Sequence, residues 1–289
     1  MLREILMNNL RKLFLIFAAI FLLSASSEAA EKYNNDFDCK AALVVDMDSG
    51  KILYEQNADR LIQPASLAKI LALYLVHEDI RSGRIHLNDM VRISAKAVKT
   101  GGSKMIHEAG REIPLSELMK GMAIHSANDA TIAVAEHLAG SVSAFVARMN
   151  AKARELGMSH SYFVNPHGLP DSHQFSTARD VYLLSCEYLQ RFPDSLNIHS
   201  ELYFTFNNVI RHNRNTLLRE CTGVDGLKTG YVRASGFHMV ATAKRENIRL
   251  IVIVLGAKNP KVRNRQTKML LEMGFQRLGN KRPDNLIGA

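Results

Sequence analysis

The chain has 289 residues, of which 47% are hydrophobic and 22% are charged. This balance excludes a disordered chain, and 3 cysteines are too few for a disulfide scaffold. The net charge of +9 is spread along the sequence without a run of five basic residues, so it predicts no nucleic-acid partner. A generally basic protein is the simpler interpretation, and binding to an anionic polymer or a membrane surface is the alternative.

The first segment of the chain has the three parts of a secretory signal. Basic residues among the first 12 precede an apolar run at 13–23 and a small-residue segment at 24–30. The apolar run is shorter than the roughly 20 residues that span a bilayer, which favours a cleaved signal peptide at 1–29 over a permanent anchor. We expect cleavage after Ala29, with Met7 as an alternative start, and export to the periplasm or the medium. A retained signal would instead keep the protein at the inner membrane.

Strand patterns lie near both ends of the mature chain. Apolar residues at 41–45 and 51–55 flank a turn that contains Gly50, which predicts a β-hairpin. A second hairpin is predicted from the stretches at 237–243 and 249–255, which are rich in Val, Ile and small residues and are joined by a polar turn. Apolar residues at three- and four-residue spacing predict helices at 66–80, 115–124, 129–138, 143–156, 177–189 and 262–278.

This order of elements predicts an α+β fold. We expect one antiparallel sheet that is built from both termini and flanked by helices, with an inserted all-helical lobe. The sheet lobe would comprise about 38–65 and 200–278, and the helical lobe about 66–199. Together the lobes would form a single domain at 30–289.

The cysteines and histidines show no metal-binding pattern. Cys39, Cys186 and Cys221 are widely spaced, without a Cys-x-x-Cys pair, and the 11 histidines contain no His-Glu-x-x-His motif. His167 and His173 share a polar loop, which is weak evidence for a ligand pair. We therefore predict no metal. The cysteines could include one disulfide with a thiol left over, or could all be buried thiols.

Ser66 and Lys69 form the only Ser-x-x-Lys pair in the chain, at the start of the first long helix. Three residues correspond to one helical turn, so the amine can lie beside the hydroxyl. A lysine desolvated at the floor of a cleft can have a pKa low enough to take the serine proton and create a nucleophile. The alternative is that Ser66 caps the helix and Lys69 is solvated.

A Ser-x-Asn motif follows at the junction of two predicted helices, where Ser126 could pass a proton to a leaving nitrogen and Asn128 could bind a substrate amide. The motif is weak alone, because Ser195 and Asn197 form a second copy. That copy directly follows Pro193, and we interpret it as a turn.

The Lys-Thr-Gly motif at 228–230 precedes a predicted strand, so it can lie on a strand edge that faces the cleft. There Lys228 and the Thr229 hydroxyl could hold a carboxylate, and Gly230 would let a substrate backbone approach closely. A second copy at 99–101 precedes Ser126, continues into Gly-Ser and has no strand after it. We interpret that copy as a loop.

The three motifs in this order resemble those of the active-site serine penicillin-recognising enzymes. Within that group the chain is similar to the D-alanyl-D-alanine carboxypeptidases, the low-molecular-mass penicillin-binding proteins, over about residues 40–278. Further agreements with that family lie at 48–55, 100–103, 126–130, 165–169, 213–215, 217–218 and 223–231. The resemblance implies the fold shared by DD-peptidases and serine β-lactamases.

The resemblance also implies roles for the motif residues. Ser66 would be the acylated nucleophile and Lys69 its base. Ser126 and Asn128 would form the second wall of the cleft.

The carboxylate-binding edge would be formed by Lys228 with Thr229 and Gly230. The backbone N–H groups of Ser66 and Tyr231 would form the oxyanion hole, which stabilises the tetrahedral state. Substrate would thus lie between the nucleophile and this edge.

Arg214 and Arg249 match family positions near the cleft, and we expect one of them to help hold the terminal carboxylate of the substrate. Surface salt bridges are the alternative. Val232 stands where the family usually has Thr, so a hydroxyl is missing there. This departure predicts a weaker grip on a β-lactam or a substrate carboxylate.

The implied activity is that of a serine D-Ala-D-Ala carboxypeptidase. It would remove the terminal D-Ala from peptidoglycan stem peptides, bind β-lactams covalently as inhibitors, and need neither a cofactor nor a nucleic-acid partner. A D,D-endopeptidase that cuts cross-links would use the same residues. A β-lactamase is less favoured, because the Glu-x-x-Leu-Asn loop of one large group is missing after Ser126.

A wall-binding protein with weak catalysis is the remaining class, and the intact polar motif residues argue against it. Family members often continue into a β-rich second domain and a membrane-binding helix. Residues 279–289 are too short and polar for either, so we expect no C-terminal β-domain and a soluble catalytic domain.

Overall fold

The structure is a computed structural model that describes residues 37–279. The predicted signal peptide at 1–29, its cleavage site and the tail from residue 280 onward lie outside the described residues.

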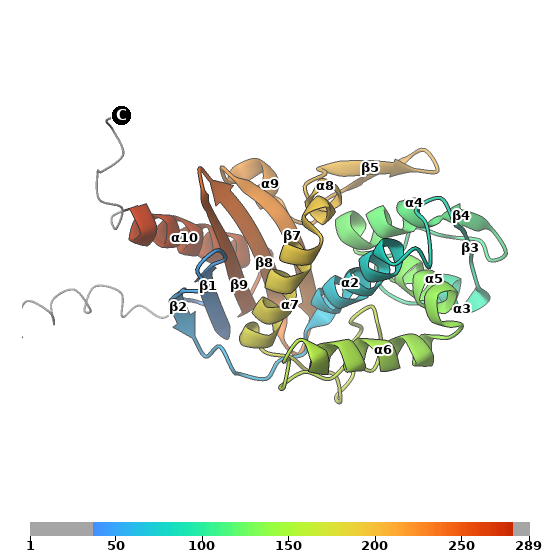
Figure 1. Cartoon of the computed structure of the whole chain (residues 1–289), viewed down its shortest axis with the longest axis horizontal. Helices are drawn as coiled ribbons and strands as arrows, with labels where there is room; N and C mark the ends of the chain where they lie inside the picture. Colours follow the sequence, from blue (N-terminus) through green and yellow to red (C-terminus); the bar gives the residue numbers. More distant parts are fainter. Residues whose placement is uncertain (1–36, 280–289) are drawn as a thin grey trace, which may run out of the picture. The chain divides into compact units, whose positions relative to one another are not determined.

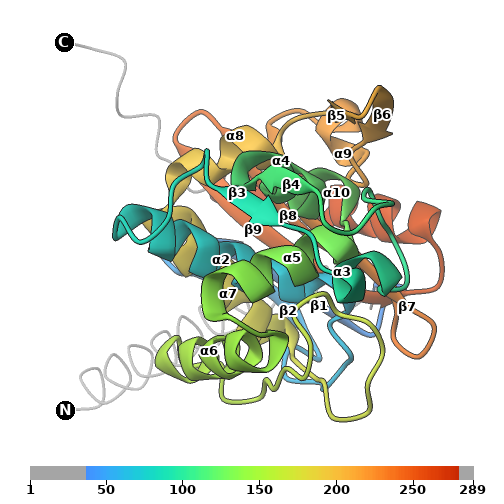
Figure 2. The ribbon, with the colours of Figure 1, turned by 90° about the vertical axis from the view of Figure 1, so that its right-hand side faces the viewer.

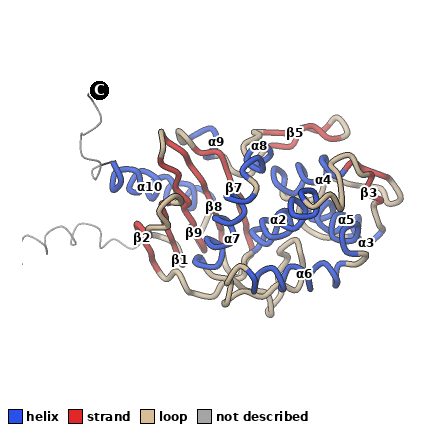
Figure 3. The backbone as a smooth tube through the Cα atoms, viewed as in Figure 1, coloured by secondary structure: helices blue, strands red, loops and turns tan. Residues whose placement is uncertain are grey.

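The main sheet is antiparallel and has five strands in the order β2-β1-β9-β8-β7, as Figure 1 and Figure 3 show. The strands are β1 (Ala41–Asp46), β2 (Ile52–Gln56), β7 (Val224–Val232), β8 (Gly236–Arg245) and β9 (Ile248–Ala257). Because β1 pairs with β9, segments from both ends of the described chain meet inside one sheet. The predicted sheet built from both termini is therefore confirmed.

Helices cover both faces of this sheet (Figure 1), which explains why β1 and β9 are largely apolar. Leu43 and Ile253 face the helices inserted in the middle of the chain. On the other face α10 (Pro260–Gly279) packs so closely that a Cβ at Gly274 would lie 2.7 Å from Leu250 and 3.0 Å from Val44. A residue larger than Gly would separate α10 from the sheet.

The segment between β2 and β7 is mostly helical, which confirms an inserted helical lobe, but the lobe is not all-helical because it contains the hairpin of β3 (Met90–Arg92) and β4 (Glu112–Pro114). Its helical elements are η1 (Ala65–Leu67), α2 (Ala68–Arg81), α3 (Ala95–Lys99), α4 (Leu115–Lys120), η2 (Gly121–His125), α5 (Asn128–Ala139), α6 (Val142–Glu155), α7 (Ala178–Arg191), η3 (Pro193–Ser195), α8 (Leu196–His199) and α9 (Leu217–Glu220). Two small hairpins join them, β3 with β4 and β5 (Tyr203–Phe206) with β6 (Val209–His212).

The predicted long helices are all present, with shifted ends. The helix predicted at 66–80 starts as the 3-10 turn η1, and the one predicted at 115–124 consists of α4 and the π-helical turn η2. The small elements were not predicted, because three to five residues carry too little periodicity. Ser195 ends the 3-10 turn η3, as the interpretation of that Ser-x-Asn copy as a turn predicts, whereas Asn197 lies in the short helix α8.

α2 is the central helix of the inserted lobe and packs against α5, α6 and α7, as Figure 2 shows from the side. Its apolar side chains are buried on nearly all sides. A lysine at the start of such a helix is therefore carried into the interior rather than into solvent.

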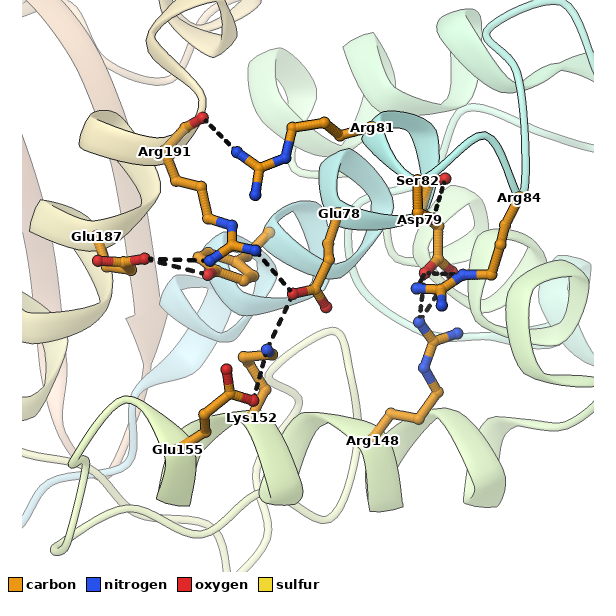
Figure 4. A network of polar contacts seen from close by, with 11 residues as sticks. Glu78, Asp79, Arg81, Ser82, Arg84, Arg148, Lys152, Glu155, Glu187 and Arg191 are labelled. Carbon is orange, nitrogen blue, oxygen red and sulfur yellow. Dashed lines mark hydrogen bonds and ion pairs between the residues drawn. The ribbon is translucent and has the colours of Figure 1, made fainter.

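Figure 4 shows the polar network that fixes the C-terminal end of α2. The carboxylate of Asp79 accepts hydrogen bonds from Arg84 and, at 2.7 and 2.9 Å, from Arg148 on α6. The neighbouring Glu78 pairs with Lys152 of α6 at 2.9 Å and with Arg191 of α7 at 3.8 Å. The network thus joins α2, α6 and α7 at the C-terminal end of α2. Lys69 lies at the opposite end of that helix.

Asp79→Ala is expected to lower the free energy of unfolding by about 2 kcal/mol, because it removes the buried acceptor of the charge-assisted hydrogen bonds that join α2 and α6. Glu155→Ala is the matched control, since Glu155 pairs with Lys152 at the surface and should cost less than about 1 kcal/mol. Urea denaturation measures both variants. Equal losses would contradict the role given to Asp79.

The three cysteines lie partly or fully buried in the described structure. Cys186 and Cys221 are free thiols, and burial raises the pKa of both, so neither is a reactive thiolate.

Within residues 37–279 no helix by itself combines the length and the apolar character needed to cross a membrane. α5 and α6 meet these criteria only as a pair, which bends by 85°.

Candidate active site

Ser66 lies in the turn η1, where the sheet lobe leads into α2. The preceding Ala65 has φ +51°, a left-handed conformation that costs energy for a residue with a Cβ. Gly168 supports this turn from the opposite side: a Cβ there would overlap the Ala65 carbonyl oxygen and lie 2.8 Å from the Ser66 nitrogen. The turn presents the half-buried Ser66 to a cavity.

Lys69 is fully buried below Ser66. Its Nζ lies 2.7 Å from Asn128 Oδ1, 2.6 Å from the His167 carbonyl oxygen and 3.2 Å from Ser66 Oγ. Burial lowers the pKa of Lys69 well below its ordinary value, and the nearby charge of Lys228 lowers it further. A neutral amine has two N–H donors and one lone pair. The two strong acceptors take the donors, which leaves the lone pair for the Ser66 proton.

Ser126 and Lys228 form a second hydroxyl–amine pair. Ser126 follows η2 in a left-handed conformation with φ +65°, and its Oγ lies 3.0 Å from Lys228 Nζ. Lys228 is also buried and donates to the Thr229 carbonyl oxygen at 3.1 Å. Burial, followed by the charges of Arg214 and Arg263, lowers the pKa of Lys228 to about 7. This pair can therefore exchange a proton near neutral pH.

The Lys-Thr-Gly motif lies on β7, which is the edge strand of the sheet. One side of its backbone is thus unpaired within the sheet and available to a ligand. Gly230 packs against the nucleophile turn: a Cβ there would lie 3.1 Å from Ala65 Cβ and 3.3 Å from the Ser66 nitrogen. The strand edge predicted from the sequence therefore lies directly beside Ser66.

A cavity of about 620 Å³ lies between β7 and the helical lobe. Its walls include Ser66, Ser126, Asn128, Thr229, Gly230 and Tyr231, together with Arg214 and Arg263. None of the described residues that line it is acidic, and the buried amines of Lys69 and Lys228 lie beneath it. The guanidinium groups on this wall favour an anionic ligand.

The structure separates the two predicted arginines. Arg214 lies on the cavity wall and donates to Ser103 Oγ at 3.2 Å. Arg249 is away from this wall: it pairs with the Asp225 carboxylate at 2.8 and 3.0 Å and donates to Thr242 Oγ1. Arg249 therefore has the salt bridge that was the alternative interpretation of this residue.

Arg263 is a cavity residue that the sequence analysis missed. It lies in the first turn of α10, is 6% exposed, and donates to Asn264 Oδ1 at 3.0 and 2.8 Å. Burial lowers the pKa of its guanidinium to about 10. The sequence contains a signal that could have found this residue. Arg263 falls on the buried face of α10 with Gln266 and Leu270, where an Arg without an ion pair is unusual.

Asp129 is a second residue without a predicted role. Its buried carboxylate accepts hydrogen bonds from the backbone N–H groups of Met105, Ile106 and Ala130 at 2.7 to 2.8 Å. These bonds fix the segment after Ser103 against the start of α5. Asp129 thereby positions the wall that contains Asn128.

In the described part of the chain, no group of three or more His, Cys, Asp and Glu side chains could hold a metal ion. His167 is buried, whereas His173 is exposed beside Asp171. Burial lowers the pKa of His167 to about 3, so its imidazole is neutral.

Comparisons with known proteins agree with this geometry. A family model described as D-alanyl-D-alanine carboxypeptidase matches residues 26–259. The D-alanyl-D-alanine carboxypeptidase DacC of Escherichia coli is 39% identical over 268 residues, which cover 90% of this chain and 67% of that protein. Penicillin binding protein 5 of Haemophilus influenzae is 36% identical, with a TM-score of 0.82 over 85% of this chain and 73% of that chain.

A third similar protein is penicillin-binding protein D2 of Listeria monocytogenes in its ampicillin-bound form. It is 31% identical, with a TM-score of 0.75 over 84% of this chain and 100% of that chain. The chain spans 61% to 67% of the length of the first curated relatives. The family match extends over most of the chain and includes the motifs from Ser66 to Gly230. The chain therefore belongs to the D-alanyl-D-alanine carboxypeptidase family.

Proposed function

We propose that this protein is a serine D-Ala-D-Ala carboxypeptidase that removes the terminal D-Ala from peptidoglycan stem peptides. The observation that carries the proposal is the buried amine of Lys69, whose lone pair is left for the hydroxyl of Ser66 at 3.2 Å. Family membership supports the same reaction.

In the acylation step, Ser66 Oγ attacks the carbonyl carbon of the penultimate D-Ala and its proton passes to Lys69 Nζ. The backbone N–H groups of Ser66 and Tyr231 stabilise the oxyanion, and one such donor is typically worth about 3 kcal/mol. Gly230 makes this arrangement possible, because β7 touches the turn that carries Ser66.

The peptide C–N bond then breaks, and the leaving amine of the terminal D-Ala needs a proton. Ser126 supplies it from its hydroxyl and is reprotonated through Lys228, whose Nζ lies 3.0 Å away. A proton then moves from Lys69 to Lys228 through solvent in the cavity, which restores the neutral base and the charged Lys228. Water attacks the acyl-enzyme with Lys69 as base, and Lys69 returns the proton to Ser66 Oγ as the shortened peptide leaves.

The terminal carboxylate of the substrate would be held by the Thr229 hydroxyl and by the positive charges of Lys228, Arg214 and Arg263. This assignment replaces Arg249 of the sequence analysis by Arg263, which lines the cavity. Penicillins carry a carboxylate next to a reactive amide, so they fit the same site and would acylate Ser66.

Export after removal of residues 1–29, a periplasmic or secreted location, and a single catalytic domain at 30–289 stay predictions. An exported enzyme would meet the peptidoglycan outside the inner membrane.

The test is the release of free D-Ala from diacetyl-L-Lys-D-Ala-D-Ala by wild type and by Ser66→Ala. We expect release by the wild type and none by the variant, and muropeptide chromatography should show conversion of pentapeptides to tetrapeptides. Loss of cross-links without release of terminal D-Ala would instead identify an endopeptidase.

The rate of acylation should fall as the pH is lowered. Lys69 acts only as the neutral amine, which is lost when the pH falls through the pKa of Lys69 in the folded protein. Because that pKa lies well below the ordinary 10.5, the half-maximal rate should also occur well below pH 10.5. Stopped-flow acylation by nitrocefin measures this profile. A rate that does not fall on the acid side would contradict the role of Lys69.

Val232→Thr should accelerate acylation by a penicillin about fivefold, the value of one net hydrogen bond of about 1 kcal/mol. Val232 lines the cavity two residues after Gly230, so the added hydroxyl can reach a ligand carboxylate. Val232→Ala changes the size without adding a hydroxyl and serves as the control. An unchanged rate in the Thr variant would refute this prediction.

A further inference from the structure

A second pocket, of about 660 Å³, adjoins the active cavity on the side of the helical lobe. His167 and Leu169 line both spaces, and Gly101 of the pocket is followed by Gly102 of the cavity. The two spaces therefore share a wall and can be reached by one extended ligand. No step of the proposed reaction uses the second pocket.

The pocket combines a cationic edge with an apolar floor. Lys96 and Lys99 project from α3 at its edge, and Ile132 of α5 and Val142 of α6 contribute apolar surface. Among the described residues, no carboxylate lies within 4.0 Å of either ammonium group and none of those lining the pocket is acidic. Both lysines are exposed and thus available to a ligand.

The wall shared with the active cavity is rigid and polar. The amide of Asn165 bridges the loop, accepting from the Gly168 N–H at 2.7 Å and donating to the Leu169 carbonyl at 3.0 Å. His167 accepts from the Leu169 N–H through Nδ1 at 3.2 Å. Since its imidazole is neutral, Nε2 carries the ring proton and is a donor.

The direction of the substrate follows from the position of the carboxylate-binding groups. Thr229 and Arg263 belong to β7 and α10 of the sheet lobe, whereas α3 belongs to the helical lobe (Figure 1). A peptide that places its terminal carboxylate at Arg263 and its scissile carbonyl at Ser66 directs its upstream residues away from α10. Gly102 and Leu169 lie on the path to the second pocket.

We infer that this pocket is a subsite for a carboxylate carried by the acyl donor upstream of D-Ala-D-Ala, with Lys96 and Lys99 as specificity-determining residues. The inference rests on the proposed function. It predicts that an acidic stem peptide is a better substrate than a neutral one, and that the preference weakens as the salt concentration rises.

The experiment compares two peptides, diacetyl-L-Lys-D-Ala-D-Ala and a peptide in which an N-acetyl-γ-D-glutamyl group with a free α-carboxylate replaces the Nα-acetyl group. In Lys96→Gln/Lys99→Gln the ratio of kcat/KM for the acidic to the neutral peptide should fall about tenfold, the effect of two exposed ion pairs. Lys261→Gln/Lys268→Gln removes the same charge from a pocket beside α10 and should leave the ratio unchanged.

A ratio that is equal in the wild type and both variants, or that falls equally in both variants, would overturn the subsite. Binding of the two peptides to Ser66→Ala by calorimetry separates this outcome from failure of the proposed function. If the wild type hydrolyses neither peptide but Ser66→Ala binds the acidic one more tightly through Lys96 and Lys99, the proposed function fails and the subsite stands. If the wild type hydrolyses both peptides without preference, the proposed function stands and the subsite fails.

Discussion

Replacing Lys69 by Met should slow the acylation of Ser66 by a penicillin about 10³-fold, because a positioned general base typically contributes about 10²- to 10⁴-fold. The thioether fills the buried volume of the lysine stem but offers no lone pair that can take the serine proton. Asn128 and the His167 carbonyl, which accept from the amine at 2.7 and 2.6 Å, would lose their donor. Stopped-flow acylation with nitrocefin provides the rate constant.

Two controls accompany this variant. Urea denaturation shows whether Lys69→Met is folded, and Lys51→Met removes an exposed lysine that lies outside both the proposed reaction and the proposed subsite. Acylation of a folded Lys69→Met protein within tenfold of the wild-type rate would mean that another group takes the proton.

Gly168→Ala should lower the rate of acylation about 10²-fold, an effect expected when a reacting group is displaced by roughly 1 Å. Gly168 has φ +86°, and its added methyl group would overlap the Ala65 carbonyl oxygen and crowd the Ser66 nitrogen at 2.8 Å. The turn that carries Ser66 must therefore shift, which also displaces one donor of the proposed oxyanion hole.

Gly157→Ala is the matched control for this substitution. Gly157 also has a positive φ, of +76°, but a Cβ there would meet only Leu183 Cδ1, at 4.0 Å. The control should thus show the backbone strain of a left-handed alanine, about 1 kcal/mol, without a change in acylation. Equal acylation rates in both variants would refute the role of Gly168.

The arrangement of the fold could be predicted because the strands β1, β8 and β9 are long apolar runs and the main helices have strong periodicity. The order of the three motifs also selected the copies that the structure brings together at one cavity. Ser195 lies in a turn, and Lys99 ends α3 outside the catalytic cavity, whereas Lys228 lies on the edge strand beside Ser66.

The remaining features depend on contacts between distant segments. Burial of Lys69 requires α5 and the loop around His167, which supply the two acceptors of its amine. Arg249 and Arg263 both lie near elements of the sheet, and only the packing of α10 decides which of them reaches the cavity. The helical periodicity of α10 puts Arg263 on the buried face of the helix. Periodicity cannot show that Arg263 lines a cavity there.

The proposed mechanism depends on Ser66 as the nucleophile and on its activation by Lys69. Incubation with benzylpenicillin, followed by intact-mass measurement over time and mapping of the labelled peptide, tests it most directly. We predict one penicilloyl adduct on Ser66 that persists, and no adduct on Ser66→Ala. An adduct on a different residue, or none on the folded wild-type protein, would contradict this mechanism, and rapid loss of the adduct would indicate a β-lactamase.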